Sequence, residues 1–431
     1  MVNRKTGLQV CSRLEVNRNV STSRMLAIHR RAWVADANSP LPDSSRDLEC
    51  SKGRDRGRVL HVCLVGLQRF LRPVGVCRYT ANLFSSLRES DDIRVTLVLG
   101  TWQKEYYREA FGLDVNDPHI LWVNLWRPSI SRYWWSLKEL PRLVQRIDAD
   151  VVHALHQMPV VKELFQVPLV LTIHDLYAYD EPRSLGYPNV YLNRFAIRSC
   201  LRASDEVVSI SRFTRSRLQH WFPKLNERMM LPVLYQQVRV AEPRCDLDQL
   251  ATVPARIFLC VAQHRKNKNL DLIIQSYHLG IERQLIDKDC QLVIVGSQGA
   301  ETGNLKSISR RGGGVHFLDS LSDSGLAYLY SVCSLFICAS SIEGFCLPVA
   351  EALLFSCRIV CPDIPVIREV AGEQATYFDL EPRSPDALLQ AIVRSLASDD
   401  GCRAKAPLSR SDPAKEWVQL YQEVHDRSAE A

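Results

Sequence analysis

Short apolar runs alternate with amphipathic segments along the chain from residue 58 onward. Six of these runs are rich in Val, Ile and Leu and have the length of buried strands: residues 59–65, 93–99, 120–124, 151–154, 169–173 and 206–210. Between several of them, apolar residues recur at helical spacing, as in residues 78–87 and 191–203. Continuous rather than alternating apolar strands predict a parallel sheet covered on both faces, and hence a doubly wound α/β domain.

The pattern pauses between Leu231 and Pro254 and then restarts. The second set of apolar runs comprises residues 257–261, 292–295, 315–318, 335–338 and 359–361. These runs predict a second doubly wound domain, so that two Rossmann-like domains face each other across a cleft at the carboxyl ends of their strands. The predicted boundaries are a basic extension over 1–57, a first domain over 58–235, a linker over 236–254, a second domain over 255–412 and a helix over 413–431 that returns to the first domain.

Length and charge limit the classes of function. A chain of 431 residues is long enough for two or three domains of roughly 100–200 residues each, and no apolar run approaches the roughly 18 residues of a membrane span. Residues 1–58 carry 12 basic and 6 acidic side chains and so hold the whole formal charge of +6, whereas residues 59–431 are balanced. A balanced body does not favour a nucleic-acid binder. We expect a solvated basic arm, with contact to an anionic membrane surface as the alternative.

Cysteine spacing does not favour a metal site or an exported protein. Most of the 14 Cys lie inside apolar runs, and no Cys-x-x-Cys pair occurs. The sequence Asp148-Ala149-Asp150 imitates a metal-binding Asp-x-Asp motif but lies where a helix passes into a strand. No apolar signal-peptide core follows the basic start. We therefore expect reduced thiols, no metal cofactor and a cytoplasmic location, with peripheral contact at the inner face of the membrane left open.

The most informative segment runs from Ser341 to Ala352 and joins a strand to a helix. Pro348 stands where proline is favoured, in the first helical turn, so the amides of Phe345, Cys346 and Leu347 are free to bind an anion such as a diphosphate. Two carboxylates, Glu343 and Glu351, flank these amides and can face the cleft, one toward a sugar and one toward a ribose diol. The simpler alternative is a solvated loop acid and a carboxylate that complements the helix dipole.

This segment resembles the E-x7-E motif of the retaining glycosyltransferases of family 4, which have the GT-B fold. A second segment, Pro365 to Gly372, is similar to the proline-x-x-x-glutamate-valine-x-glycine sequence of that family. The resemblance implies that Glu343 contacts the donor sugar, that Glu351 holds the ribose hydroxyls and that the backbone of Gly344, Phe345, Cys346 and Leu347 meets the diphosphate and sugar.

Three further segments resemble the same family. In the run from Ala262 to Leu270, Lys268 matches the phosphate-binding lysine; Gln263 stands where some relatives have Arg, which leaves Arg265 or Lys266 as the substitute. In Thr172-Ile173-His174-Asp175-Leu176, the resemblance places His174 beside the donor sugar. The loop that begins at Gly75 matches the glycine-rich loop that approaches a phosphate or sugar. His153, at the end of another strand, is a weaker candidate near the acceptor.

The sequence departs from the family at a few positions. Cys77, Cys346 and Cys357 stand where relatives commonly have Gly, and Ile359 stands where they commonly have Pro. A Cys in place of Gly is harmless where φ is negative and costly where the backbone is left-handed.

The residues and the resemblance together predict a retaining glycosyltransferase. It would move a hexose, with mannose favoured because the arginine-lysine-asparagine segment resembles mannosyl-transferring relatives, from a nucleoside diphosphate sugar to a saccharide or lipid-linked saccharide in polysaccharide or glycolipid synthesis. Two alternatives stay open: a non-catalytic GT-B-like binding partner, and a retaining glycosidase, whose two carboxylates must lie about 5–5.5 Å apart. The basic, Trp-rich stretch 126–146 is expected to face the core, with membrane contact as the second interpretation.

Overall fold

The computed structural model describes residues 59–69, 71, 74–182, 186–227, 256–319, 321–398 and 413–430. Gly57–Ala431 forms one compact unit. The predicted extension over 1–57 and the linker over 236–254 lie outside the described residues. No helix in the described part of the chain is long and apolar enough to cross a bilayer.

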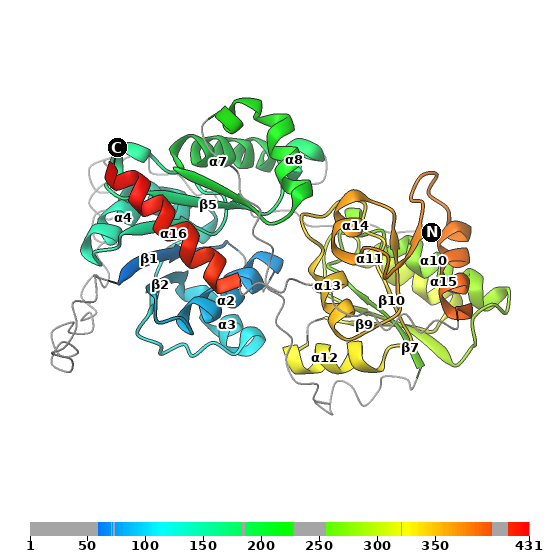
Figure 1. Ribbon diagram of the computed structural model, residues 1–431. Helices are drawn as coiled ribbons and strands as arrows, with labels where there is room; N and C mark the ends of the chain where they lie inside the picture. The colour runs from blue at the N-terminus through cyan, green and yellow to red at the C-terminus, as the bar shows by residue number, and fades with distance from the viewer. Residues whose placement is uncertain are drawn as a thin grey trace, which may run out of the picture. The chain divides into compact units, whose positions relative to one another are not determined.

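Two six-stranded parallel sheets confirm the predicted fold class (Figure 1). The first has the order β3 (Ile120–Val123), β2 (Ile93–Gly100), β1 (Leu60–Val65), β4 (Val151–Ala154), β5 (Leu169–Ile173) and β6 (Glu206–Ser209). The second has the order β12 (Thr376–Phe378), β11 (Ile359–Pro362), β10 (Leu335–Ile337), β7 (Arg256–Val261), β8 (Cys290–Val295) and β9 (Val315–Leu318). In both sheets the strand order reverses beside the first strand, which is where open parallel sheets bind ligands.

Helices cover both faces of each sheet because successive strand residues point to opposite sides. In the first sheet, Val62 and Leu64 pack toward α2 (Gly75–Arg88) and α3 (Lys104–Phe111), whereas Cys63 and Val65 pack toward α4 (Pro128–Arg146) and α7 (Asn189–Ala203). In the second sheet, one face carries α12 (Asp323–Val332), α13 (Leu347–Leu354) and α14 (Pro365–Ala371), and the other carries α10 (Leu270–Glu282), α11 (Thr302–Gly312) and α15 (Pro385–Ala397). The shorter helical elements are α5 (Tyr177–Asp180), α8 (Arg212–Trp221), η1 (Thr101–Gln103), η2 (Lys162–Leu164), η3 (Pro223–Glu227) and η4 (Lys266–Lys268).

The C-terminal helix α16 (Pro413–Glu430) packs beside α2 on the first sheet (Figure 1). The Tyr421 hydroxyl lies 2.7 Å from His153 Nδ1, and Arg427 Nη2 donates to the buried Glu206 carboxylate at 2.6 Å. Chain segments far apart in the sequence thus complete the core of the first domain.

The expectation of a core-facing aromatic stripe over 126–146 is only partly right. Trp135 is buried against the first sheet, but Trp126 and Trp134 are exposed. The helix α4 therefore presents aromatic side chains to its outer side as well as to the core.

Candidate active site

The segment with the two candidate carboxylates folds as a strand-to-helix turn. It leaves β10 after Ile337 and enters α13 at Leu347, and Pro348 occupies the first helical turn. No side chain caps the start of α13; Pro348 has no N–H and the Val349 amide donates to the Cys346 carbonyl at 3.1 Å, which leaves the Leu347 amide for a ligand. The candidate donor-binding residues Phe345 and Cys346 are both buried in this turn.

Of the three Cys that stand where relatives commonly have Gly, only Cys346 adopts the conformation that favours glycine. Cys346 has φ 67° and ψ 61°, whereas Cys77 and Cys357 are not among the residues with positive φ in the described part of the chain. An L-residue in left-handed geometry costs roughly 1–2 kcal/mol. The strain falls on the residue that begins α13, so it acts directly on the proposed diphosphate site.

Lys268 and Glu343 form an ion pair, although 75 residues separate them in the sequence. Lys268 ends η4, which follows β7, and Glu343 follows the neighbouring strand β10. The Ser341 amide donates to the Asn267 carbonyl at 2.9 Å and ties the two loops together. Burial opposes the charge on Lys268, but the Glu343 carboxylate outweighs it, so the pKa of Lys268 is raised and the ammonium persists.

The second carboxylate, Glu351, lies inside α13 and is almost fully buried. Burial raises its pKa, although Arg78 and the Tyr330 hydroxyl oppose that shift. Tyr330 donates to Glu351 Oε2 at 2.9 Å, and Arg78 Nε lies 3.6 Å from Glu351 Oε1. Arg78 also forms a bidentate pair with Asp323 at 2.7 and 2.8 Å, so a side chain of α2 links the first domain to two acids of the second.

The loop around Gly344 rests against the end of β5. A Cβ atom at Gly344 would lie 2.0 Å from the His174 carbonyl oxygen, so only glycine fits. The Ser211 hydroxyl donates to the Gly344 carbonyl at 2.6 Å, and the Tyr177 hydroxyl donates to the Ile342 carbonyl at 3.1 Å. The structure therefore brings the predicted residues Gly344 and His174 together.

His174 is held as a neutral imidazole. Its Nε2 donates to the Leu155 carbonyl at 2.8 Å, and its ring contacts the Tyr79 ring edge-on at 4.7 Å between centroids. Burial lowers the pKa of His174 to about 4. A ring fixed in this way can accept or position a hydroxyl but carries no positive charge near neutral pH.

Asp175 is a site residue that the sequence interpretation missed. The pKa of its carboxyl is raised to about 6, mainly by burial. The hydrogen bond that the carboxylate accepts from the Tyr177 amide at 3.2 Å lowers this pKa, and the charge of the nearby Glu343 raises it. The charge on Arg265 also lowers the pKa of Asp175. Arg265 thus acts electrostatically on the His174 side of the site. The signal that the sequence offered for Asp175 was the position of this residue just after the end of a buried strand.

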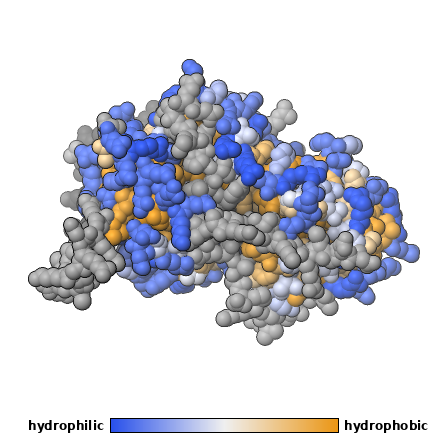
Figure 2. Space-filling model, in the orientation of Figure 1, coloured by the Kyte–Doolittle hydropathy of each residue, from blue (hydrophilic) through white to orange (hydrophobic). Residues whose placement is uncertain are grey.

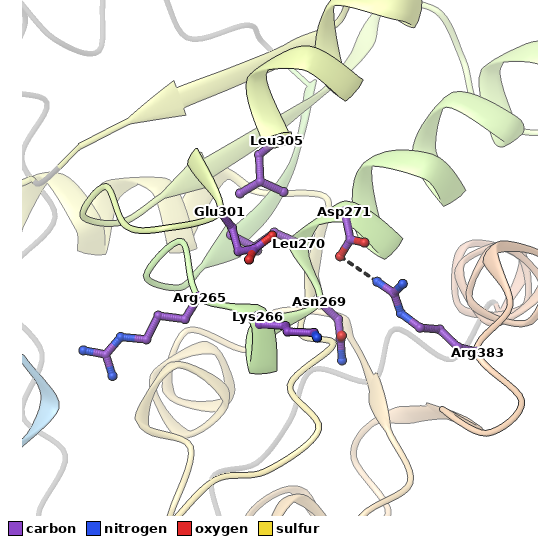
Figure 3. A pocket seen from close by; sticks show the side chains of 8 residues that line it. All are labelled: Arg265, Lys266, Asn269, Leu270, Asp271, Glu301, Leu305 and Arg383. Atoms are coloured by element: carbon purple, nitrogen blue, oxygen red, sulfur yellow. Dashed lines mark ion pairs between the residues drawn. The ribbon is translucent and has the colours of Figure 1, made fainter. Parts of the chain in front are cut away.

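A pocket of about 200 Å³ lies beside η4 and the start of α10 (Figure 3). It is lined by Arg265, Lys266, Asn269, Leu270, Asp271, Glu301, Leu305 and Arg383. In Figure 3 the Arg265 side chain extends away from Lys266 and Asn269. Of the two substitutes left open by the sequence, Arg265 is the one whose charge acts on Asp175.

Gly75 opens α2 close to the start of α13. A Cβ atom at Gly75 would meet Leu347 Cδ1 at 4.0 Å. The glycine-rich loop of the first domain and the helix start of the second are thus neighbours, which places Gly75 and Leu347 in one site.

The weaker candidate, His153, was wrongly placed near an acceptor. Its side chain is fully buried beneath α16, with Nε2 2.8 Å from Thr172 Oγ1 and its ring tilted by 31° against the Trp417 ring at 4.8 Å between centroids. Burial lowers the pKa of His153 to about 3. The physical reason for the error is the return of a helix from the other end of the chain, which closes over the strand end.

Asp150 has a structural partner, since its Oδ2 accepts a hydrogen bond from the His61 amide at 2.8 Å. Within the described ranges, no group of three or more His, Cys, Asp or Glu side chains is arranged to hold a metal ion.

Two family models match the chain where the two sheets lie. The model of glycosyl transferases group 1 matches residues 248–407, and the model of glycosyltransferase family 4 matches residues 74–230. The fold and these two matches agree, and the chain belongs to the family 4 type of glycosyltransferases with the GT-B fold. By class it is a glycosyltransferase.

Among curated proteins, the chain is similar to bacterial mannosyltransferases. O-antigen chain mannosyltransferase B of Escherichia coli is 24% identical over 251 residues, which are 53% of this chain and 61% of that protein. Serotype-specific mannosyltransferase WbdA of Escherichia coli is 33% identical over 33% of this chain and 15% of its own length. O-antigen chain mannosyltransferase RfbU of Salmonella typhimurium strain LT2 is 22% identical over 71% of this chain and 83% of its own length. The matches thus span less than two thirds of the first two relatives.

Solved structures share the fold at low identity. Anabaena HepE in complex with UDP and glucose has a TM-score of 0.58 and 15% identity, covering 86% of this chain and 98% of its own. WaaG, a glycosyltransferase involved in lipopolysaccharide biosynthesis, has a TM-score of 0.55 and 14% identity, and the match covers 85% of this chain and 98% of WaaG.

Proposed function

We propose that this chain is a retaining glycosyltransferase that moves a hexose, with mannose favoured, from a nucleoside diphosphate sugar to a saccharide or lipid-linked saccharide. The observation that carries the proposal is the Lys268–Glu343 ion pair beside the contact between Gly344 and His174, where the strand ends of both sheets meet. The similarity to O-antigen mannosyltransferases supports mannose, and HepE with UDP and glucose supports a nucleotide-sugar donor. We place the reaction in polysaccharide or glycolipid synthesis.

Each charged group has a role in this proposal. Lys268, Arg265 and the Leu347 amide at the start of α13 stabilise the departing diphosphate, because fixed positive groups are worth most where charge develops. Glu343 orients the donor sugar and Glu351 the ribose. The leaving phosphate takes the proton of the acceptor hydroxyl, and the sugar keeps its anomeric configuration because attack and departure use the same face. His174, neutral and fixed, positions a sugar hydroxyl.

The ion pair also suggests how the donor binds. Without a ligand, Glu343 neutralises Lys268, so the diphosphate must draw the ammonium away from the carboxylate. Glu343 is then released to accept hydrogen bonds from the sugar. Donor binding and orientation of the sugar are thus coupled through one exchange of partners.

The first experiment is a thermal-shift panel with UDP, GDP, dTDP and ADP and their sugars on purified protein without added metal. A ligand that binds only the folded state raises the thermal midpoint. It stabilises the folded state by about 2.7 kcal/mol when its concentration is a hundred times its dissociation constant. We expect one nucleotide class, GDP, to stabilise the protein, and GDP-mannose to release GDP when acceptor is present. Stabilisation by none of the nucleotides would contradict the proposal.

The non-catalytic alternative has one specific observation in its favour, the left-handed Cys346 in the proposed diphosphate site. It predicts binding of the sugar nucleotide without turnover with any acceptor. The retaining-glycosidase alternative is disfavoured by the family matches, and nucleotide dependence would decide against it.

A further inference from the structure

Two neighbouring helices of the first domain carry exposed apolar side chains at helical spacing. Before and within α4 these are Trp126, Ile130 and Trp134; before and within α7 they are Tyr187, Tyr191 and Phe195. Within the helices, Ile130 and Trp134 of α4 are four residues apart, as are Tyr191 and Phe195 of α7, so each pair lies on one side of its helix. Trp126 and Tyr187 stand just before the two helices. All six are between 53% and 82% exposed, which is far beyond what core packing would leave. We call these six residues the aromatic face.

Both helices pack on the same side of the first sheet. Trp135 of α4 and Ile197 of α7 belong to the same apolar cluster beneath the helices. A short segment between them touches both, because Ser136 Oγ donates to the Pro159 carbonyl at 2.8 Å and the Val160 amide donates to Ser199 Oγ at 3.1 Å. This segment therefore bridges α4 and α7, and the exposed Val161 and Leu164 follow it.

The charge of these helices is strongly positive. From Arg127 to Arg146 there are five basic side chains and one acid, Glu139, and α7 has three Arg and no acid. Residues 59–431 as a whole are balanced, so the excess on these two helices is local. In Figure 2 most of the described surface is hydrophilic, and apolar residues are exposed only in places.

Aromatic and basic groups are also paired within this face. The Arg127 guanidinium lies 4.4 Å from the centre of the Trp126 ring, and the Lys138 ammonium lies 5.5 Å from that of Trp134. Trp and Tyr prefer the level of lipid headgroups, and Lys or Arg beside them can meet lipid phosphates. A protein partner would have to match this charge with an acidic surface, whereas an anionic bilayer supplies it everywhere.

We infer that the aromatic face docks the first domain on the surface of an anionic phospholipid bilayer. The six side chains enter the headgroup region while α4 and α7 lie in the plane of the interface, and the basic side chains contact lipid phosphates. This inference concerns a surface apart from Lys268 and Glu343 and does not depend on the proposed transfer reaction.

Flotation of the full chain with lipid vesicles tests the inference. We expect binding to vesicles of phosphatidylethanolamine and phosphatidylglycerol, weak binding to phosphatidylcholine alone, and loss of binding as salt is raised. Replacing Trp126, Ile130 and Trp134 together by Ser should weaken binding by at least about tenfold, since three of the six apolar side chains, two of them Trp, are removed. The pair Tyr191→Ser and Phe195→Ser should weaken it in the same direction. Leu285→Ser is the matched control, because Leu285 is exposed on the second domain.

The basic residues 1–58 are kept in every variant, so the experiment separates their contribution from that of the aromatic face. Binding by the Ser variants equal to that of the unchanged protein would overturn the inference, because the arm would then suffice. Absence of binding to anionic vesicles would overturn it as well. So would a dimer that the Ser substitutions convert to a monomer, since a second copy would then be the occupant. Unchanged circular dichroism of the variants shows that the fold is intact.

Discussion

Replacing Gly344 by Ala tests whether the contact between the two domains positions the donor loop. The added methyl would lie 2.0 Å from the His174 carbonyl oxygen, and real Cβ contacts essentially never fall below 3.0 Å. The loop or the strand end must therefore move by about 1 Å, a misplacement that can cost on the order of a hundredfold in rate. We expect the rate of sugar transfer to fall by about that factor.

The effect on stability follows from the same geometry. Overpacking of a close contact costs about 1–3 kcal/mol, and a displaced loop also weakens the hydrogen bonds from Ser211 and Tyr177, at about 1 kcal/mol each. We expect the free energy of unfolding to fall by about 3–5 kcal/mol if the loop moves within the folded domain pair. If the two domains move apart instead of the loop moving, activity falls while the denaturation midpoint of each domain stays unchanged.

Gly303→Ala is the matched control. Gly303 is exposed in α11, and nothing lies within 4 Å of its added Cβ, so this substitution should leave activity unchanged and raise stability by up to about 1 kcal/mol. The assays are nucleotide release with donor and acceptor, and urea unfolding followed by circular dichroism. Full transfer activity in Gly344→Ala would refute the positioning role of this contact.

Three other predictions rest on single groups. Lys268→Ala should weaken binding of the nucleoside diphosphate in calorimetry, and an unchanged dissociation constant would remove Lys268 from the site. Cys346→Gly should be more stable than Cys346→Ala by about 1 kcal/mol in urea unfolding, the reverse of the usual order, because only glycine is unstrained at φ 67°. The pKa of His153 is lowered to about 3 in the folded state, below its unfolded value near 6.5, so the unfolded state binds the proton first and stability falls as the pH drops below 6.5. Between pH 7 and 5 this histidine should cost about 2 kcal/mol, and His153→Gln should show a correspondingly smaller loss; an equal loss would disprove it.

Local patterns were sufficient to predict the strands that form most of both sheets. Continuous apolar runs mark β1, β2, β7 and β8 because each is buried on both faces and is long enough for its composition to stand out. Strand β12 escaped prediction for the opposite reason: it has three residues, lies at the edge of its sheet and is only partly buried. Its short length and partial burial are what hide it, because the other edge strands, β3, β6 and β9, were predicted.

The candidate site was predictable where a short motif carried it. Glu343 and Lys268 lie in the segments that follow β10 and β7, and neighbouring parallel strands bring their carboxyl ends together, so the topology places the two residues near each other. The partners of Glu351 did not follow, because Tyr330 comes from α12 of the same domain and Arg78 comes from α2 of the first domain, far away in the sequence. No local pattern records which distant helix will face a given carboxylate.

The same comparison explains why the two histidines at strand ends differ. Both His153 and His174 follow apolar strands of the first sheet, and both are neutral because burial lowers the pKa of each ring. The helix α16 closes over His153 and pairs with its Nδ1 through Tyr421, while Thr172 of β5 pairs with its Nε2; the backbone of His174 instead faces the Gly344 loop of the second domain. What separates a structural histidine from a site residue here is therefore the element that packs against it. For His153 that element is the C-terminal helix α16, and for His174 it is the Gly344 loop of the second domain.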